Sequence, residues 1–211
     1  MKARMRAAEV LLWLTAAVLL GLCAFVYLER NLYQAVQSWA FDRALQASPP
    51  AHGLGSAPGR AAAPMPAGAP IGRIEIPRVG VRAMIVNGTA ASTLRRAVGH
   101  IEGTPLFGGG GNVALAAHRD TFFRGLRNIR RGDTIEIDTL QGVYKYVVDG
   151  TEIVGPNDTR VLAASARPTL TLVTCYPFNA IGPAPRRFIV QARMVEPHAG
   201  GAIKPRPSRG S

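Results

Sequence analysis

The stretch Pro168-Thr-Leu-Thr-Leu-Val-Thr-Cys-Tyr-Pro-Phe178 joins a mostly apolar run to a cysteine and an immediate proline. Threonine and valine in such a run favour a β-strand. Proline disfavours helical geometry in the residue before it, so the chain turns away directly after Cys175. The stretch therefore predicts a strand that ends in a thiol. That thiol is either a buried, inert side chain or a nucleophile.

Similar strand signals recur on both sides of this stretch, separated by glycine and proline. They alternate with period two or are wholly apolar. We expect strands at residues 73–77, 80–86, 112–117, 134–138, 142–148, 151–154, 169–174 and 188–195. We expect short helices at residues 92–98, directly after His118 and at 159–164. Many short strands at regular spacing predict a mainly β fold that closes, or nearly closes, into a barrel.

An apolar segment precedes this folded unit. Val10–Leu28 has no charged residue and is long enough to cross the hydrocarbon core once as a helix. Lys2, Arg4 and Arg6 stand before it, so the positive-inside rule places the N-terminus in the cytoplasm and the rest outside. A cleaved signal peptide is the alternative, but no small-residue cleavage site ends the apolar run. The sequence predicts a single-pass membrane anchor.

The chain of 211 residues divides by composition. Residues 31–45 show apolar side chains at helical spacing. From Ser48 to Pro70 the chain is rich in proline, glycine and alanine, which cannot bury a core and are typical of a tether. We expect five parts, which are a cytoplasmic N-terminus (1–9), an anchor (10–28), a membrane-proximal helix and tether (29–70), a folded domain (71–196) and a disordered tail (197–211).

The chain is strongly basic, with 25 Lys and Arg against 13 Asp and Glu. The positive charge is scattered and no basic run is interleaved with aromatic residues, which argues against a nucleic-acid partner. A surface that faces anionic lipid or wall polymer explains the charge as well. The two cysteines are Cys23, inside the anchor, and Cys175. Cys175 therefore has no disulfide partner within its own domain.

Four histidines are candidates for a partner to the thiol, and two of them, His52 and His198, fall in the tether and the tail. His100 lies near a glycine-rich loop, and His118 ends an apolar strand. A strand-terminal imidazole and a strand-terminal thiol can converge at one end of a barrel. Imidazole then supports the thiolate of Cys175 and protonates a leaving amine. The plainer interpretation of His118 is a histidine that bonds the backbone at the barrel rim.

Charged side chains complete the set of candidates. Arg186 and Arg187 enter the last expected strand, and one of them should point inward. A fixed guanidinium can stabilise an oxyanion or hold backbone carbonyls of a substrate. The alternative is a solvated arginine pair. Asp120 could organise the loop after His118 through a side-chain bond to the backbone.

These residues carry a family resemblance. TLVTC resembles the TLxTC signature of sortases, the membrane-anchored cysteine transpeptidases of bacterial surfaces. The order of histidine, TLxTC and arginine is also the family order. GNVALAAHRDTFF is similar to the family's histidine segment, although Ala117 stands where many relatives have glycine. TCYPF followed by APRRF is most similar to class D sortases. The resemblance implies a sortase-type eight-stranded β-barrel with a few short helices, preceded by one transmembrane helix.

The resemblance also implies roles for individual residues. Cys175 would attack the Thr–Gly or Thr–Ala bond of an LPxTG-like sorting signal and form a thioacyl enzyme. His118 would be the acid and base, and Arg187, which directly precedes the aromatic-aliphatic strand, would be the third catalytic residue. Arg186 is the alternative to Arg187. Val173 and Thr174 would line the groove for the Leu-Pro part of the signal.

The partners implied are surface proteins that carry the sorting signal and an amine acceptor, from a cell-wall precursor or another protein. We expect no cofactor and no metal, because the sequence lacks the acidic calcium cluster of some class A members. It also lacks the DPW or DPF lid motif of pilin-building members, which favours an anchoring enzyme. Two other interpretations remain. One is a cysteine hydrolase in which water resolves the thioester, and the other is a tethered barrel that binds wall polymer without catalysis.

Overall fold

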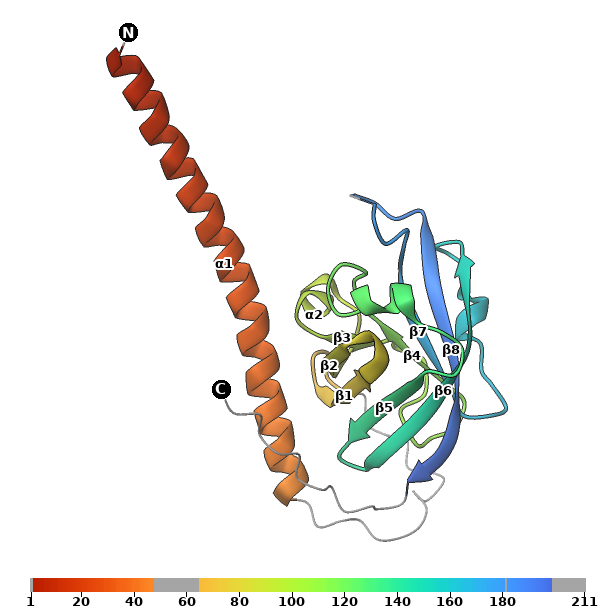
Figure 1. The fold of residues 1–211 in the computed structure, drawn as a ribbon. Coiled ribbons are helices and arrows are strands. Elements are labelled where there is room, and N and C mark those ends of the chain that lie inside the picture. The colour runs from red at the N-terminus through yellow and green to blue at the C-terminus, as the bar shows by residue number, and fades with distance from the viewer. Residues whose placement is uncertain (1, 48–64, 181, 199–211) are drawn as a thin grey trace.

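The computed structural model describes residues 2–180 and 182–198 except for 48–64. Eight strands form one closed barrel in the order β1-β2-β3-β4-β7-β8-β6-β5, which confirms the mainly β fold and the expected eight-stranded barrel (Figure 1). In chain order the elements are α1 (Lys2–Ala47), β1 (Pro70–Ile76), η1 (Pro77–Val79), β2 (Val81–Asn87), α2 (Ala91–Arg96), β3 (Val98–His100), β4 (Asn112–Ala116), η2 (Arg124–Asn128), β5 (Thr134–Thr139), β6 (Gly142–Val154), η3 (Thr159–Leu162), β7 (Thr169–Tyr176) and β8 (Arg186–His198).

The strand directions decide which loops meet at each end of the barrel. β4 and β7 run parallel, whereas β7 and β8 run antiparallel. The C-terminal ends of β4 and β7 and the start of β8 therefore lie at one end, which we call the Cys175 end. β3 runs antiparallel to β4, so β3 begins at the Cys175 end, directly after α2. β2 runs parallel to β3 and antiparallel to β1, so η1, which joins β1 to β2, lies at this end too.

The barrel interior is filled by alternating side chains of the strands. Period-two alternation sends one side of each strand inward, and the inward residues of all strands meet in a single apolar cluster. Burial of one such side chain contributes about 1.5–3 kcal/mol as an upper estimate. Fully buried members include Ile74, Ile76, Ile135, Ile137, Leu170 and Leu172.

Two strands differ from expectation. β6 is one continuous strand where we expected separate strands at 142–148 and 151–154. Between the two expected strands, the pairing of β6 with β8 shifts register from Val148 to Gly150. The strand itself continues past this shift. β3 was not expected, because three residues are too few to display alternation. The helix expected at 92–98 ends earlier, at Arg96, to make room for it.

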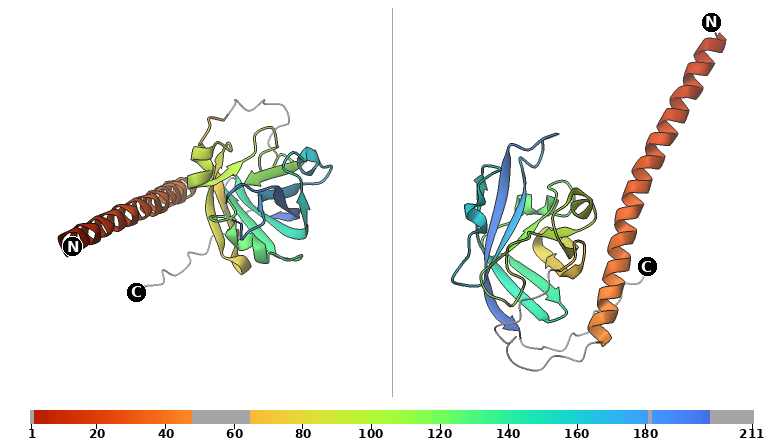
Figure 2. Two further views of the ribbon diagram at one scale, coloured as in Figure 1. Left: turned by 90° about the horizontal axis from the view of Figure 1, so that it is seen from above. Right: turned by 180° about the vertical axis from the view of Figure 1, so that it is seen from behind.

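The helix α1 is continuous from Lys2 to Ala47, so the expected anchor and the expected membrane-proximal helix form one element. It is the one helix within the described ranges that is long and apolar enough to cross a membrane. Its second half lies beside β1, β2 and α2 in each view (Figures 1 and 2).

The ends of the folded domain extend slightly beyond the expected bounds. The Asn87 backbone N–H donates to the Ala69 carbonyl at 2.8 Å, so the last residues of the expected tether already belong to the barrel. β8 continues to His198, whose backbone pairs with Val143, although we placed His198 in the tail. Residues 48–64 of the expected tether, with His52, and 199–211 of the expected tail lie outside the described residues.

An ion pair between Arg78 of η1 and Asp133 joins two loops at the Cys175 end. Arg78 donates to both carboxylate oxygens of Asp133, and the Arg130 backbone N–H donates to Oδ2 at 2.7 Å. The Arg78 hydrogen bonds are the main cause that lowers the pKa of Asp133 below its usual value, while burial acts in the opposite direction.

This lowered pKa predicts a pH-dependent contribution to stability. The stabilisation is fully present above the unfolded pKa of about 3.9 and is lost as pH falls through the lower folded value. We expect Asp133→Asn to reduce the free energy of unfolding near neutral pH, and the difference from the wild type to shrink below about pH 4. Urea denaturation in detergent across this pH range measures it. A difference that stays constant down to the acid limit would contradict the assignment.

Candidate active site

Cys175 is the penultimate residue of β7 and lies opposite Arg187 of β8 in the antiparallel pair. Residues directly opposite in such a pair send their side chains to the same face of the sheet. Both side chains are partly exposed. Arg186 lies opposite Tyr176 instead, on the other face. Of the two candidate arginines, Arg187 therefore shares the face of the thiol.

His118 reaches the same end through the parallel pairing of β4 with β7, whose last pair is Ala116 with Val173. One residue on, Ala117 donates its N–H to the Val173 carbonyl at 3.2 Å and accepts from the Thr174 hydroxyl at 2.7 Å. His118 directly follows Ala117 just past the end of β4, just as Cys175 directly follows Thr174 near the end of β7. The imidazole, which is partly exposed, and the thiol thus leave two neighbouring strand ends at matching positions.

The guanidinium of Arg187 is held by its own loop. Its Nη1 donates to the carbonyl oxygens of Ala184 and Arg186, both at 3.1 Å. On the other side of the turn, the rings of Tyr176, Phe178 and Phe188 contact one another, with the Phe178 and Phe188 centroids 5.2 Å apart. This aromatic cluster packs the chain that leaves Cys175 against the strand that carries Arg187.

The two residues before Cys175 point to opposite faces of β7. Val173 lies on the face of the thiol and packs against a small apolar cluster of Val154, Val161 and Ile189. Thr174 is only 2% exposed, and its hydroxyl is committed to Ala117. The two neighbours that we expected to line one groove therefore do not share a face. Thr174 instead links the ends of β7 and β4.

Asn112, at the start of β4, fixes the connection between β6 and β7 beside this face. Its side-chain nitrogen donates to the carbonyls of Val161 at 3.0 Å and Ala163 at 3.2 Å. Its Oδ1 accepts from the Thr171 hydroxyl at 2.8 Å. The sequence does not indicate a role for Asn112, because an asparagine before an apolar run gives no sign of partners about fifty positions away.

Arg119, the residue after His118, bonds the connection between β7 and β8. Its side chain is buried with the residue 9% exposed, and its Nη2 donates to the carbonyls of Ala180 and Gly182, both at 2.8 Å. These carbonyls belong to the connection between Cys175 and Arg187. Its Nη1 is buried without a hydrogen-bond partner among the described residues. We expected Asp120 to organise this loop, but Asp120 is exposed and Arg119 makes the long-range contacts.

The remaining histidine of interest, His100, is a structural residue. It is 3% exposed, and its Nε2 lies 3.0 Å from the Pro105 carbonyl oxygen and 3.1 Å from the Thr104 hydroxyl. In the described part of the chain no three His, Cys, Asp or Glu side chains gather as metal ligands would. The groups that converge at the Cys175 end are thus a thiol, an imidazole and a guanidinium, which suit nucleophilic attack, proton transfer and stabilisation of an oxyanion.

The contacts of Arg119 predict a local effect. We expect Arg119→Met to speed hydrogen–deuterium exchange in residues 177–185, because two charge-assisted hydrogen bonds to that connection are lost. Exchange in the barrel strands should stay unchanged. Arg124→Met is the matched control, since Arg124 lies in the same loop but is exposed. Equal exchange in the two variants would show that Arg119 does not hold the connection.

Comparisons with known proteins show which family this fold and sequence resemble. A family model described as the sortase domain matches residues 74–195. Among curated proteins, Sortase D of Bacillus subtilis (strain 168) is 34% identical over 125 residues, which cover 59% of this chain and 63% of the relative. Sortase A of Bacillus anthracis is 26% identical over 129 residues, covering 59% and 60%. The chain thus spans less than two thirds of the length of these curated relatives.

Solved structures show the same likeness. A Sortase D5 transpeptidase of Clostridium perfringens aligns with a TM-score of 0.55 and 31% identity, over 60% of this chain and 79% of the other. Sortase C of Clostridium perfringens SM101 aligns with a TM-score of 0.57 and 29% identity, over 63% and 73%. Class D members stand in both comparisons, in agreement with the similarity inferred from TCYPF and APRRF.

Proposed function

The chain belongs to the sortase family, and we propose that it is a membrane-anchored cysteine transpeptidase that cleaves an LPxTG-like sorting signal. One observation carries this proposal. The strand register brings Cys175 of β7, Arg187 of β8 and His118, two residues after β4, to the same end of the barrel. Such a constellation has little structural purpose, because none of these three side chains is buried in the core.

The first half of the reaction is acylation. The Sγ thiolate of Cys175 attacks the carbonyl carbon of the threonine in the signal, and the bond from this carbon to the following nitrogen breaks. His118 donates a proton to the leaving amine, and the product is a thioacyl enzyme. In the second half an amine attacks the thioester, His118 takes up the proton of the incoming amine, and the thiolate of Cys175 leaves.

Arg187 supplies positive charge where the oxyanion develops. Its guanidinium shares the face of the thiol and is restrained by the Ala184 and Arg186 carbonyls. A restrained donor stabilises charge in the transition state without reorganising at that moment. A guanidinium also suits the backbone carbonyls of an extended peptide, since it presents several donors in one plane.

The apolar part of the signal lies beside the thiol on the face that Val173 shares with Ile189, Val154 and Val161. Leucine and proline side chains bury apolar area there. The connection between β6 and β7, which Asn112 holds in place, sets the shape of this surface. We assign Thr174 a positioning role, because its hydroxyl fixes the strand end that carries Cys175.

The membrane topology follows from the charge pattern. Residues 1–9 lie in the cytoplasm, Val10–Leu28 crosses the bilayer, and the barrel stands on the outer side. The partners are surface proteins that bear the signal and an amine acceptor in the cell envelope. The reaction then joins the surface protein to the envelope.

A covalent adduct tests the nucleophile. We expect the full chain in detergent, incubated with LPxTG and LPxTA peptides, to gain the mass of the acyl fragment on Cys175, and added triglycine to increase product formation. Cys175→Ala should form no adduct. Cys23→Ala is the matched control and should behave as the wild type, because Cys23 is an exposed residue of α1 and not of the barrel.

Three results would count against the proposal in different ways. Folded protein with no adduct on any peptide would contradict the nucleophile. An adduct on Cys175 with product formation unaffected by amines would indicate a cysteine hydrolase. Binding of wall polymer that persists in Cys175→Ala, in the absence of any turnover, would indicate a binding module.

The two adjacent arginines give a second test. We expect Arg187→Gln to lower kcat/KM about 100-fold or more, because loss of one oxyanion donor costs that much in other enzymes. Arg186→Gln should change it little, since Arg186 lies on the other face of β8. Steady-state kinetics on the same peptide compares them. Equal losses, or the larger loss at Arg186, would overturn the assignment.

A further inference from the structure

The second half of α1 is fastened along the side of the barrel. The Oε1 of Gln34 accepts from the backbone N–H of Met84 in β2 at 2.9 Å, and its Nε2 donates to the Arg96 carbonyl at the end of α2. Further along α1, Phe41 is 5% exposed beneath the guanidinium of Arg73, which lies 5.8 Å from the ring centroid. Because these contacts are made at several positions along α1, they fix the orientation of the barrel relative to the proposed anchor.

The order of these contacts turns the Cys175 end toward the membrane. Nearest the anchor, Glu29 pairs with Arg96, and the guanidinium of Arg30 lies 5.9 Å from the Phe122 centroid. Arg96 ends α2, and Phe122 lies in the connection after β4, so both belong to the Cys175 end of the barrel. The contact with Arg73, in the middle of β1, comes more than two helical turns later. The ribbon views show the same course, with the N-terminal half of α1 continuing beyond that end of the barrel (Figures 1 and 2).

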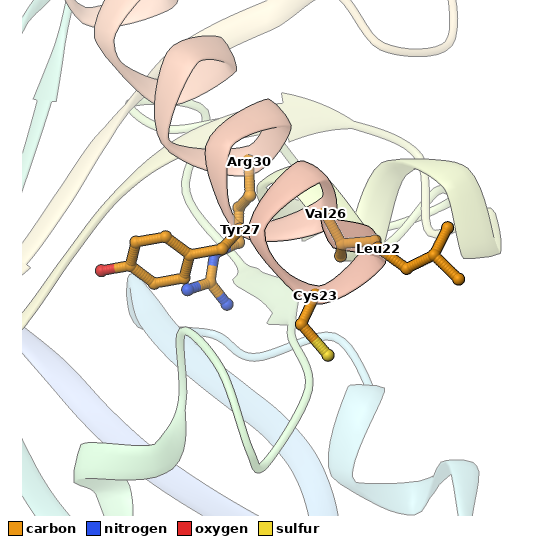
Figure 3. A pocket seen from close by; sticks show the side chains of 5 residues that line it. All are labelled: Leu22, Cys23, Val26, Tyr27 and Arg30. Atoms are coloured by element: carbon orange, nitrogen blue, oxygen red, sulfur yellow. The ribbon is translucent and has the colours of Figure 1, made fainter. Parts of the chain in front are cut away.

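The boundary of the membrane can be placed on α1. The anchor ends at Leu28, and its last turns show Tyr27 beside Arg30, whose guanidinium lies 5.3 Å from the tyrosine ring (Figure 3). A tyrosine followed by an arginine at the end of an apolar span is typical of the membrane–water interface. With the proposed anchor in the membrane, Phe122, which contacts Arg30, would lie at the level of the lipid headgroups.

The connection that carries Phe122 is rich in arginine. The connection between β4 and β5, residues 117–133, contains five arginines and two aspartates. One of the aspartates, Asp133, is already neutralised by Arg78. Four of the arginines are exposed, and they form what we call the arginine rim, which consists of Arg124, Arg127, Arg130 and Arg131.

We propose that the arginine rim binds the headgroups of anionic phospholipids and holds the Cys175 end against the outer surface of the membrane. Three observations support this together: the contacts that fix α1 to the barrel, the contact of Phe122 with Arg30 at the end of the proposed anchor, and the excess of positive charge in the connection that carries Phe122. The proposal does not depend on catalysis. It places the thiol where a substrate that is itself tethered to the membrane would meet it.

Hydrogen–deuterium exchange of the full chain in lipid nanodiscs tests the proposal. The discs contain phosphatidylcholine alone or phosphatidylcholine with phosphatidylglycerol. We expect exchange in residues 119–133 to be several-fold slower in the anionic discs at low salt, and this difference to fall as salt is raised. Exchange in the buried strands reports whether each sample is folded.

Two triple variants separate the rim from charge in general. Arg124→Gln, Arg127→Gln and Arg131→Gln together should abolish the difference between the two kinds of disc. Arg160→Gln, Arg167→Gln and Arg193→Gln remove the same charge from exposed positions on the β6, β7 and β8 side, and should leave the difference intact.

Either of two results would overturn the proposal. One is equal exchange of residues 119–133 in neutral and anionic discs. The other is protection of these residues in neutral discs on addition of soluble anionic wall polymer, with none from anionic lipid, which would assign the rim to the polymer.

Discussion

The parallel register of β4 and β7 is the constraint on which the site depends. It runs from Asn112 opposite Thr169 to Ala116 opposite Val173, and the hydroxyl of Thr174 extends it to Ala117. Because side chains alternate along a strand, a slip of one residue would turn Cys175 into the barrel and away from Arg187. The core prevents this slip, since the same register buries Leu170 and Leu172. Packing and chemistry are thus specified together.

Buried polar side chains then hold the loops around this register. Asn112 fixes the connection before β7, and Arg119 fixes the connection after it. Both side chains bond backbone carbonyls, so they position chain segments and leave the functional side chains free. A buried donor that loses its partner costs about 1–3 kcal/mol, which makes such contacts effective at selecting one loop conformation. The fastening of α1 by Gln34 extends the same principle to the orientation of the whole barrel.

The sequence predicted the barrel and most of its strands, because apolar alternation is a local signal. Cys175, His118 and Arg187 were named from their expected places at strand ends and from the family resemblance, and their roles stay a prediction. It did not predict β3, which is too short to alternate, or the continuity of β6 past Val148. It did not predict that Val173 and Thr174 point to opposite faces of β7, because residues 170–172 of this strand are buried on both faces and the apolar pattern is then ambiguous. The role of Arg119 depends on carbonyls about sixty positions away, which no local pattern reports.

The strand register puts position 118 next to Cys175, at the ends of two neighbouring strands. Neighbouring strands lie about 4.8 Å apart, within the Cα separation that a disulfide spans. Mild oxidation of the full chain carrying His118→Cys and Cys23→Ala, followed by peptide mass spectrometry, measures this most directly. The account predicts a disulfide between positions 118 and 175, and none when Asp120→Cys replaces the first substitution. Free thiols at both positions in a folded protein, with Cys175 still open to alkylation, would contradict it.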